Sequence, residues 1–138
     1  MSGQPRRNED RFYRYPMHRV VAIIDDESQV DAALDHLGRA GVEVTGVNVL
    51  SGPQGARLLD RSGTGHGLRA RLVRLAQRGA YEIDVLRAHE RALNDGHHVI
   101  YVPVRGDNER RKVVDILRAA GGHYLLHFRA WSIEEFLT

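Results

Sequence analysis

The sequence predicts a mixed α/β domain. Four short apolar runs, which begin near Arg19, Val42, His98 and His123, have the length and composition of β-strands. The stretches between them repeat apolar residues at the spacing of an amphipathic helix. One long polar stretch, from Ser51 to Gly67, interrupts this alternation after the second run. The predicted order is therefore β-α-β, a helical insert, and a second β-α-β.

The size and composition of the chain are those of one globular domain. Its 138 residues are 42% hydrophobic and 28% charged, with a formal net charge of +2. We expect a flexible N-terminal tail over 1–17 and a single α/β domain over 18–138, with the insert at 51–96. The absence of cysteine excludes disulfides and thiol nucleophiles. The chain shows neither a membrane-spanning apolar run nor a secretory signal, so a cytoplasmic location is expected.

The first strand is predicted over Arg19–Asp25, a run whose two faces are both apolar. Such a strand normally lies in the middle of a sheet that is covered on both sides. The helix that follows is expected to be capped by Ser28, with Asp31 completing an approximate capping box, and to end at Gly41. Its buried stripe is formed by apolar residues at helical spacing, namely Val30, Ala33, Leu34 and Leu37.

The later elements are predicted from the same signals. The run Val42–Leu50 contains Gly46, and the run His123–Arg129 has two unlike faces, so both indicate edge strands. The run His98–Val104 is mostly apolar and indicates a central strand. Helices are expected over 68–78, 83–93, 107–120 and 132–137.

Two architectures place the first and third strands in the middle of the sheet. One is a ferredoxin-like α+β sandwich, a split β-α-β sheet with the insert between its second and third strands. The other is a flavodoxin-like open parallel sheet. In the first, the two main helices cover one face of the sheet. The other face then has to be buried by the insert or by a second subunit, which predicts a homodimer.

Two stretches of the chain resemble one bacterial family. The half RVVAIIDDESQVDAALDHLGRAGVEVTGVNVL is similar to the opening of the heat-induced general stress protein family, and HHVIYVPVRGDNERRKVVDILRAAGGHYLLHF is similar to its closing half. The resemblance covers about half of the chain and is carried by the order of elements. It implies a ferredoxin-like, dimer-forming module and favours the first architecture. It assigns no functional residues, and the long insert departs from the family pattern.

The polar stretch after the second strand is the predicted binding site. Glycines in DRSGTGHG let backbone N–H groups approach a ligand, and a helix is expected to begin near its end. The side chains expected to contact a small anionic ligand or nucleotide are Asp60, Ser62, Thr64, His66 and Arg69. The simpler interpretation is a glycine-rich connection in which Ser62 or Thr64 caps the helix.

Acidic and histidine residues were the other candidates for chemistry. Asp25, Asp26 and Glu27 follow the first strand, where a ligand or magnesium could bind, but capping of the helix explains them more simply. His123 and His127 share a strand face but lie roughly 13 Å apart at the strand rise, too far for one metal ion. We therefore predict no metal, no cofactor and no catalytic residue.

The leading functional hypothesis is a non-catalytic, stress-associated regulatory or small-anion-binding module. One alternative is a small enzyme that acts on a phosphorylated or carboxylated substrate, with His66 as its acid or base. Another is association with nucleic acid or the ribosome through the arginine-rich tail. Nucleic acid is not expected as a partner, because acidic residues nearly balance the basic ones.

Overall fold

The computed structural model describes residues 6–7, 18–64, 81–128 and 133–136. Their strands form one sheet in the order β1-β3-β4-β2-β5-β6. Every neighbouring pair is antiparallel except β1 and β3, which are parallel. The strands are β1 (Arg6–Arg7), β2 (Arg19–Ile24), β3 (Asn48–Ser51), β4 (His98–Pro103), β5 (His123–Phe128) and β6 (Ile133–Phe136).

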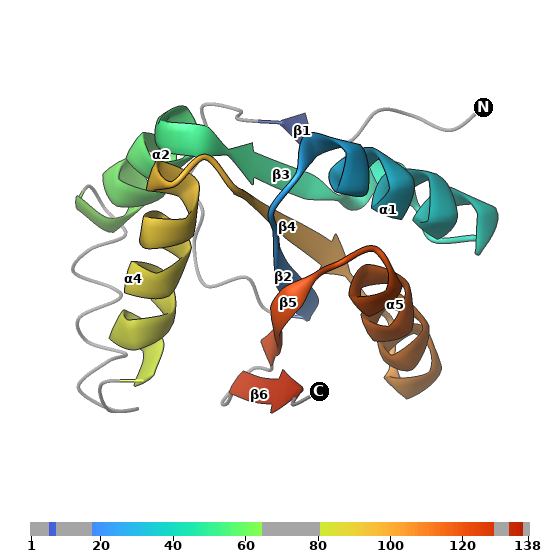
Figure 1. Ribbon diagram of the computed structural model, residues 1–138. Coiled ribbons are helices and arrows are strands. Elements are labelled where there is room, and N and C mark those ends of the chain that lie inside the picture. Colours follow the sequence, from blue (N-terminus) through green and yellow to red (C-terminus); the bar gives the residue numbers. More distant parts are fainter. Residues whose placement is uncertain (1–5, 8–17, 65–80, 129–132, 137–138) are drawn as a thin grey trace.

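Helices cover both faces of this sheet (Figure 1). α1 (Glu27–Arg39) and α5 (Asp107–Ala119) lie on one face, while α2 (Gly52–Thr64) and α4 (Tyr81–Asn94) lie on the other. A short 3-10 turn, η1 (Val44–Gly46), leads into β3. Among the described residues, no helix combines the length and the apolar content that crossing a membrane requires.

The mixed α/β class is confirmed, and the directions of the strands exclude one of the two predicted architectures. The flavodoxin-like alternative is wrong, because β2, β3, β4 and β5 pair with one another only in antiparallel ladders. Their order, β3-β4-β2-β5, puts the first and third predicted strands in the middle. This order and these directions agree with a split β-α-β sheet that carries an insert.

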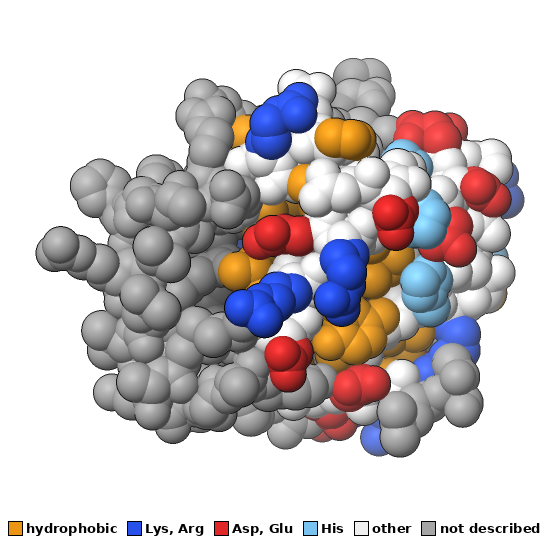
Figure 2. Space-filling model, turned by 60° about the vertical axis from the view of Figure 1, so that its left-hand side comes forward, with side chains coloured by type: hydrophobic (Ala, Val, Ile, Leu, Met, Phe, Trp, Pro, Cys, Tyr) orange, Lys and Arg blue, Asp and Glu red, His pale blue; other side chains and the backbone are white. Residues whose placement is uncertain are grey.

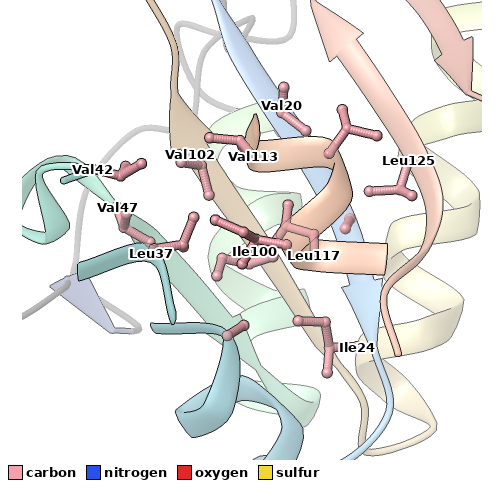
Figure 3. Packing of buried hydrophobic residues seen from close by; sticks show 14 of the residues in the cluster. Val20, Ile24, Leu37, Val42, Val47, Ile100, Val102, Val113, Leu117 and Leu125 are labelled. Atoms are coloured by element: carbon pink, nitrogen blue, oxygen red, sulfur yellow. The ribbon is translucent and has the colours of Figure 1, made fainter. Parts of the chain in front are cut away.

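The two faces of β2 explain why the sheet lies between two hydrophobic cores. Val20, Ala22 and Ile24 point into the core beneath α1 and α5, part of which Figure 3 shows. Val21 and Ile23 point into the core beneath α2 and α4. A strand that is apolar on both faces gains from burial only where both faces are covered.

The insert supplies the second covering layer. Leu59 of α2 and Leu93 of α4 are buried against residues from β2, β3, β4 and β5. The sequence analysis predicted a dimer as one way to bury the second face of the sheet. Because α2 and α4 cover that face, this reason for a dimer no longer holds. Dimerisation stays a prediction.

The polar stretch after β3 is largely helical, which corrects the expectation of a loop. Gly52, with φ of +61°, makes the turn out of β3, and Pro53 suits the first turn of a helix. Ala56 and Leu59 then bury one side of α2 in the core. This packing outweighs the low helix propensity of the glycines and serines in the segment.

The predicted closing helix is also wrong, because Ile133–Phe136 forms β6 and pairs with β5. A helix of about six residues is marginal by itself, whereas a strand here gains ladder hydrogen bonds and packs Phe136 against the core beneath α5.

Two element boundaries differ from expectation. α1 begins at Glu27 rather than after Ser28, because Asp26 caps it and its N–H donates to Gln29 Oε1 at 3.3 Å. The second strand is shorter than predicted, since η1 takes up its first half.

Gly46, the last residue of η1, packs closely against β4. An added Cβ at this position would lie 3.0 Å from Pro103 Cγ, so glycine permits the close approach of the two segments.

Candidate functional site

Six polar residues meet at the end of the sheet where β2 and β3 finish and where β4 and β5 begin. We call this group the polar row; it consists of Asp25, Glu27, Ser51, His97, His98 and His123. In Figure 2, histidine and acidic side chains lie together along one margin of the described surface.

The register of two strands brings Ser51 and His98 together. They are direct partners in the antiparallel pair of β3 and β4. Their neighbours Leu50 and Val99 point into the core beneath α2 and α4. Because side chains alternate along a strand, Ser51 and His98 share the opposite face, where α1 begins.

The first part of the polar row is a serine, a histidine and a glutamate. Ser51 Oγ and His98 Nδ1 are 2.8 Å apart, and His98 Nε2 lies 3.6 Å from Glu27 Oε2. His98 is buried, Ser51 is partly buried and Glu27 is exposed. With the ring proton on Nε2, Nδ1 accepts a hydrogen bond from the serine hydroxyl while Nε2–H faces the carboxylate.

The second part of the row centres on Asp25. His123 Nε2 lies 2.8 Å from Asp25 Oδ1, and His97 Nδ1 lies 3.3 Å from the same oxygen. The hydrogen bond from His123 lowers the pKa of Asp25 below its ordinary value; the charges of His123 and His97 lower it further, and partial burial opposes the shift. Asp25 therefore stays ionised at neutral and mildly acidic pH.

A backbone hydrogen bond joins the two parts. Gly52 N–H donates to the carbonyl of His97 at 3.0 Å. This hydrogen bond holds the turn after Ser51 next to His97, the residue that precedes β4. Ser51 directly precedes α2, and the N-terminal end of a helix carries partial positive charge.

None of the residues of the predicted binding site belongs to the polar row. Asp60, Ser62 and Thr64 belong to the last turns of α2 rather than to a loop. His66 and Arg69 lie outside the described residues. Whether these residues bind a ligand stays a prediction.

Sequence reasoning drew attention to Asp25, Glu27 and His123 separately but did not bring them together as a group. Capping accounts for Asp26, as predicted, whereas Asp25 and Glu27 contact histidines. Ser51 was not singled out. The signal that could have found it is a serine at a strand-to-helix junction, paired in register with a histidine.

Histidines elsewhere have other contacts. Whereas His123 contacts Asp25, His127 Nδ1 lies 3.6 Å from Glu134 Oε1. That carboxylate also contacts Arg110 Nη1 at 3.3 Å, which links α5 to β6. In the part of the chain that the structure describes, no three histidine or acidic side chains are arranged to hold a metal ion.

Comparisons with family models, curated proteins and solved structures return no match. The resemblance to the heat-induced general stress protein family therefore stays a prediction, and the functional argument depends on the site alone.

Proposed function

We propose that this protein is a small hydrolase in which Ser51 is the nucleophile and His98 is the general base. The proposal differs from the enzyme alternative of the sequence analysis, in which His66 was the acid or base and the substrate was phosphorylated or carboxylated. One observation carries it: Ser51 Oγ lies 2.8 Å from His98 Nδ1, while a carboxylate lies beside the other ring nitrogen. A nucleophile within reach of a base that a third group orients is the usual signature of an activated serine.

The proposed reaction follows from which of the three side chains can donate or accept a proton. Ser51 Oγ attacks a carbonyl carbon and passes its proton to His98 Nδ1. Glu27 favours the resulting imidazolium, which then protonates the leaving group. Water, deprotonated by the same ring, hydrolyses the acyl-serine. The positive end of α2 lies next to Ser51 and would favour the negative charge that develops on the carbonyl oxygen.

Charge argues against a site for small anions at the polar row. The row contains the carboxylates of Asp25 and Glu27, and Asp26 lies between them in the sequence. These carboxylates repel a free phosphate or carboxylate at neutral pH. An uncharged ester or amide meets no such barrier.

The test is hydrolysis of p-nitrophenyl acetate and butyrate by the purified chain between pH 5 and 9. We expect Ser51→Ala and His98→Gln each to lower kcat/KM by about 10²-fold or more, the usual effect of removing a positioned acid–base group. Glu27→Gln should lower it less. Ser28→Ala is the matched control, since Ser28 is exposed in the first turn of α1. If all variants hydrolysed the esters at the rate of the parent, the proposal would be wrong, and a non-catalytic binding module would again be the leading hypothesis.

A further inference from the structure

A polar cavity lies at the end of the sheet opposite the polar row. β4 starts at the polar row with His98 and ends at Pro103, whose ring lines this cavity. The cavity has a volume of about 360 Å³, within the range of roughly 300–1,000 Å³ that is usual for sites of small molecules. Its walls come from the segment around η1, from the end of β4 and from the start of α5, and they include Glu43, Thr45, Gly46, Pro103, Arg105 and Glu109.

Two carboxylates line the cavity, and within the described residues each accepts a hydrogen bond at one oxygen. Glu43 Oε1 accepts from the hydroxyl of Thr45 at 3.3 Å. Glu109 Oε1 accepts from the backbone N–H of Arg105 at 3.0 Å. Because an ionised carboxylate accepts at both oxygens, Oε2 of each glutamate remains as an acceptor for a ligand.

Arg105 adds a positive charge to the same cavity without pairing with either glutamate. In the part of the chain that the structure describes, its backbone N–H is hydrogen-bonded to Glu109, but its guanidinium forms no hydrogen bond or ion pair. Opposite charges therefore line one cavity and stay apart from each other. A ligand that itself carries both charges can contact all of these groups at once.

We propose that this cavity binds a free amino acid. The guanidinium of Arg105 holds the ligand's carboxylate, since the two groups match in a bidentate pair. The α-ammonium has three donors for the acceptors of Glu43 and Glu109. The ring of Pro103 supplies an apolar wall for the ligand's side chain. This inference does not depend on the proposed function.

The net charge of the cavity selects among amino acids. Its two carboxylates and one guanidinium leave one excess negative charge. Opposite charge raises the local concentration of a ligand and its association rate. Arginine and lysine, which carry a net positive charge, are therefore the expected ligands, ahead of neutral and acidic amino acids.

The experiment is isothermal titration calorimetry of the full chain at constant ionic strength with three related compounds. L-Arginine carries both charged groups of an amino acid, agmatine lacks the carboxylate, and N-acetyl-L-arginine lacks the ammonium. L-Arginine should bind tightest. Each of the other two should bind about tenfold more weakly, the usual effect of losing a hydrogen bond to a charged group.

Two variants assign each charge of the ligand to its partner. Arg105→Gln should weaken arginine binding about tenfold and leave agmatine binding unchanged, because the guanidinium holds the carboxylate. Glu43→Gln should weaken the binding of arginine and agmatine and leave that of N-acetyl-L-arginine unchanged. Arg118→Gln is the matched control, since Arg118 is exposed in the last turn of α5, away from the cavity. Thermal unfolding without ligand confirms that the variants fold.

The result that supports the proposal is this pattern of losses, with none in the control. Binding of no amino acid at millimolar concentration would overturn the site. Agmatine or N-acetyl-L-arginine that bound as tightly as arginine would overturn recognition of a free amino acid. An equal loss in Arg118→Gln would reveal general attraction to the surface and would also overturn it. Ester hydrolysis should be unchanged in Arg105→Gln, so this inference and the proposed function fail separately.

Discussion

Ser51 and His98 lie directly opposite each other in neighbouring antiparallel strands, and their side chains meet at 2.8 Å. They are 47 positions apart in the sequence, so no local motif joins them. The register of β3 against β4 creates the contact, and the insert that separates the two strands packs on the other face of the sheet. α2 and α4 can therefore cover a core on the face of the sheet that lies away from this contact.

Asp25 links pH to stability. Its lowered pKa means that the folded state favours the ionised carboxylate. This contribution is present above the unfolded pKa, near 3.8, and is lost as pH falls through the lower folded pKa. Because half of the Asp25 side chain is exposed, Asp25→Asn should cost less than about 1 kcal/mol at pH 7.

Urea unfolding of Asp25→Asn at pH 7 and at pH 3 measures this dependence. The difference from the parent should shrink at the lower pH. Asp115→Asn is the control, because Asp115 is an exposed acid on α5. A cost for Asp25→Asn that grows on acidification would contradict the assignment.

Leu93 tests whether the insert belongs to the cooperative core. It is fully buried and packs on the sheet from α4. Leu93→Ala should lower the free energy of unfolding by about 2–5 kcal/mol, the usual cost of such a cavity. Leu117→Ala, in the core beneath α5, should cost a similar amount. Suppose instead that Leu93→Ala lowered the free energy of unfolding by less than about 1 kcal/mol, while Leu117→Ala lowered it by the full expected amount. The insert would then unfold separately from the rest of the domain.

Gly122 is required by a close backbone contact. A Cβ at this position would lie 2.6 Å from the carbonyl oxygen of Leu117. Gly122→Ala should therefore destabilise by about 1–3 kcal/mol, because the end of α5 has to move. The same substitution at Gly38, inside α1, meets only Val44 Cγ2 at 3.6 Å and should stabilise by up to about 1 kcal/mol. Thermal unfolding of the two variants should show shifts of opposite sign, and shifts of the same sign would refute the argument.

Arg110 holds β6 against the rest of the sheet. Its guanidinium contacts Glu134 and lies 5.5 Å from the centre of the Phe136 ring, although only 12% of the Arg110 side chain is exposed. Arg110→Ala leaves that carboxylate without this partner. Amide hydrogen exchange within Ile133–Phe136 should then accelerate at least tenfold, with β2 unaffected. Arg111→Ala, at an exposed neighbour, should change neither, and unchanged exchange in β6 after Arg110→Ala would rule out this role.

Strong periodic signals predicted the layers of the fold. The two apolar faces of β2 indicated a central strand, and the stripe that includes Val30 and Leu37 indicated α1. Weak local signals failed where packing or pairing competed with them. The glycines after β3 suggested a loop, but buried Leu59 stabilises a helix there. A capping pattern suggested a closing helix, but strand pairing forms β6 instead.

Signals that are local in the sequence could not predict the polar row, for a related reason. Asp25 follows the end of β2 and His123 begins β5, and only the sheet order brings the two side chains to 2.8 Å. Sequence analysis placed His123 on a strand face but could not identify Asp25 as its partner. The same holds for Ser51, which looks like an ordinary residue at the start of a polar segment.

The measurement that tests the central claim most directly is covalent labelling with a fluorophosphonate, read by mass spectrometry of the digested protein. A serine activated by a neighbouring base reacts with this reagent, while ordinary serines do not. We predict one label on Ser51 in the parent and in Ser28→Ala, and none on that residue in His98→Gln. A parent protein that stays unlabelled, or that is labelled equally without His98, would contradict the account.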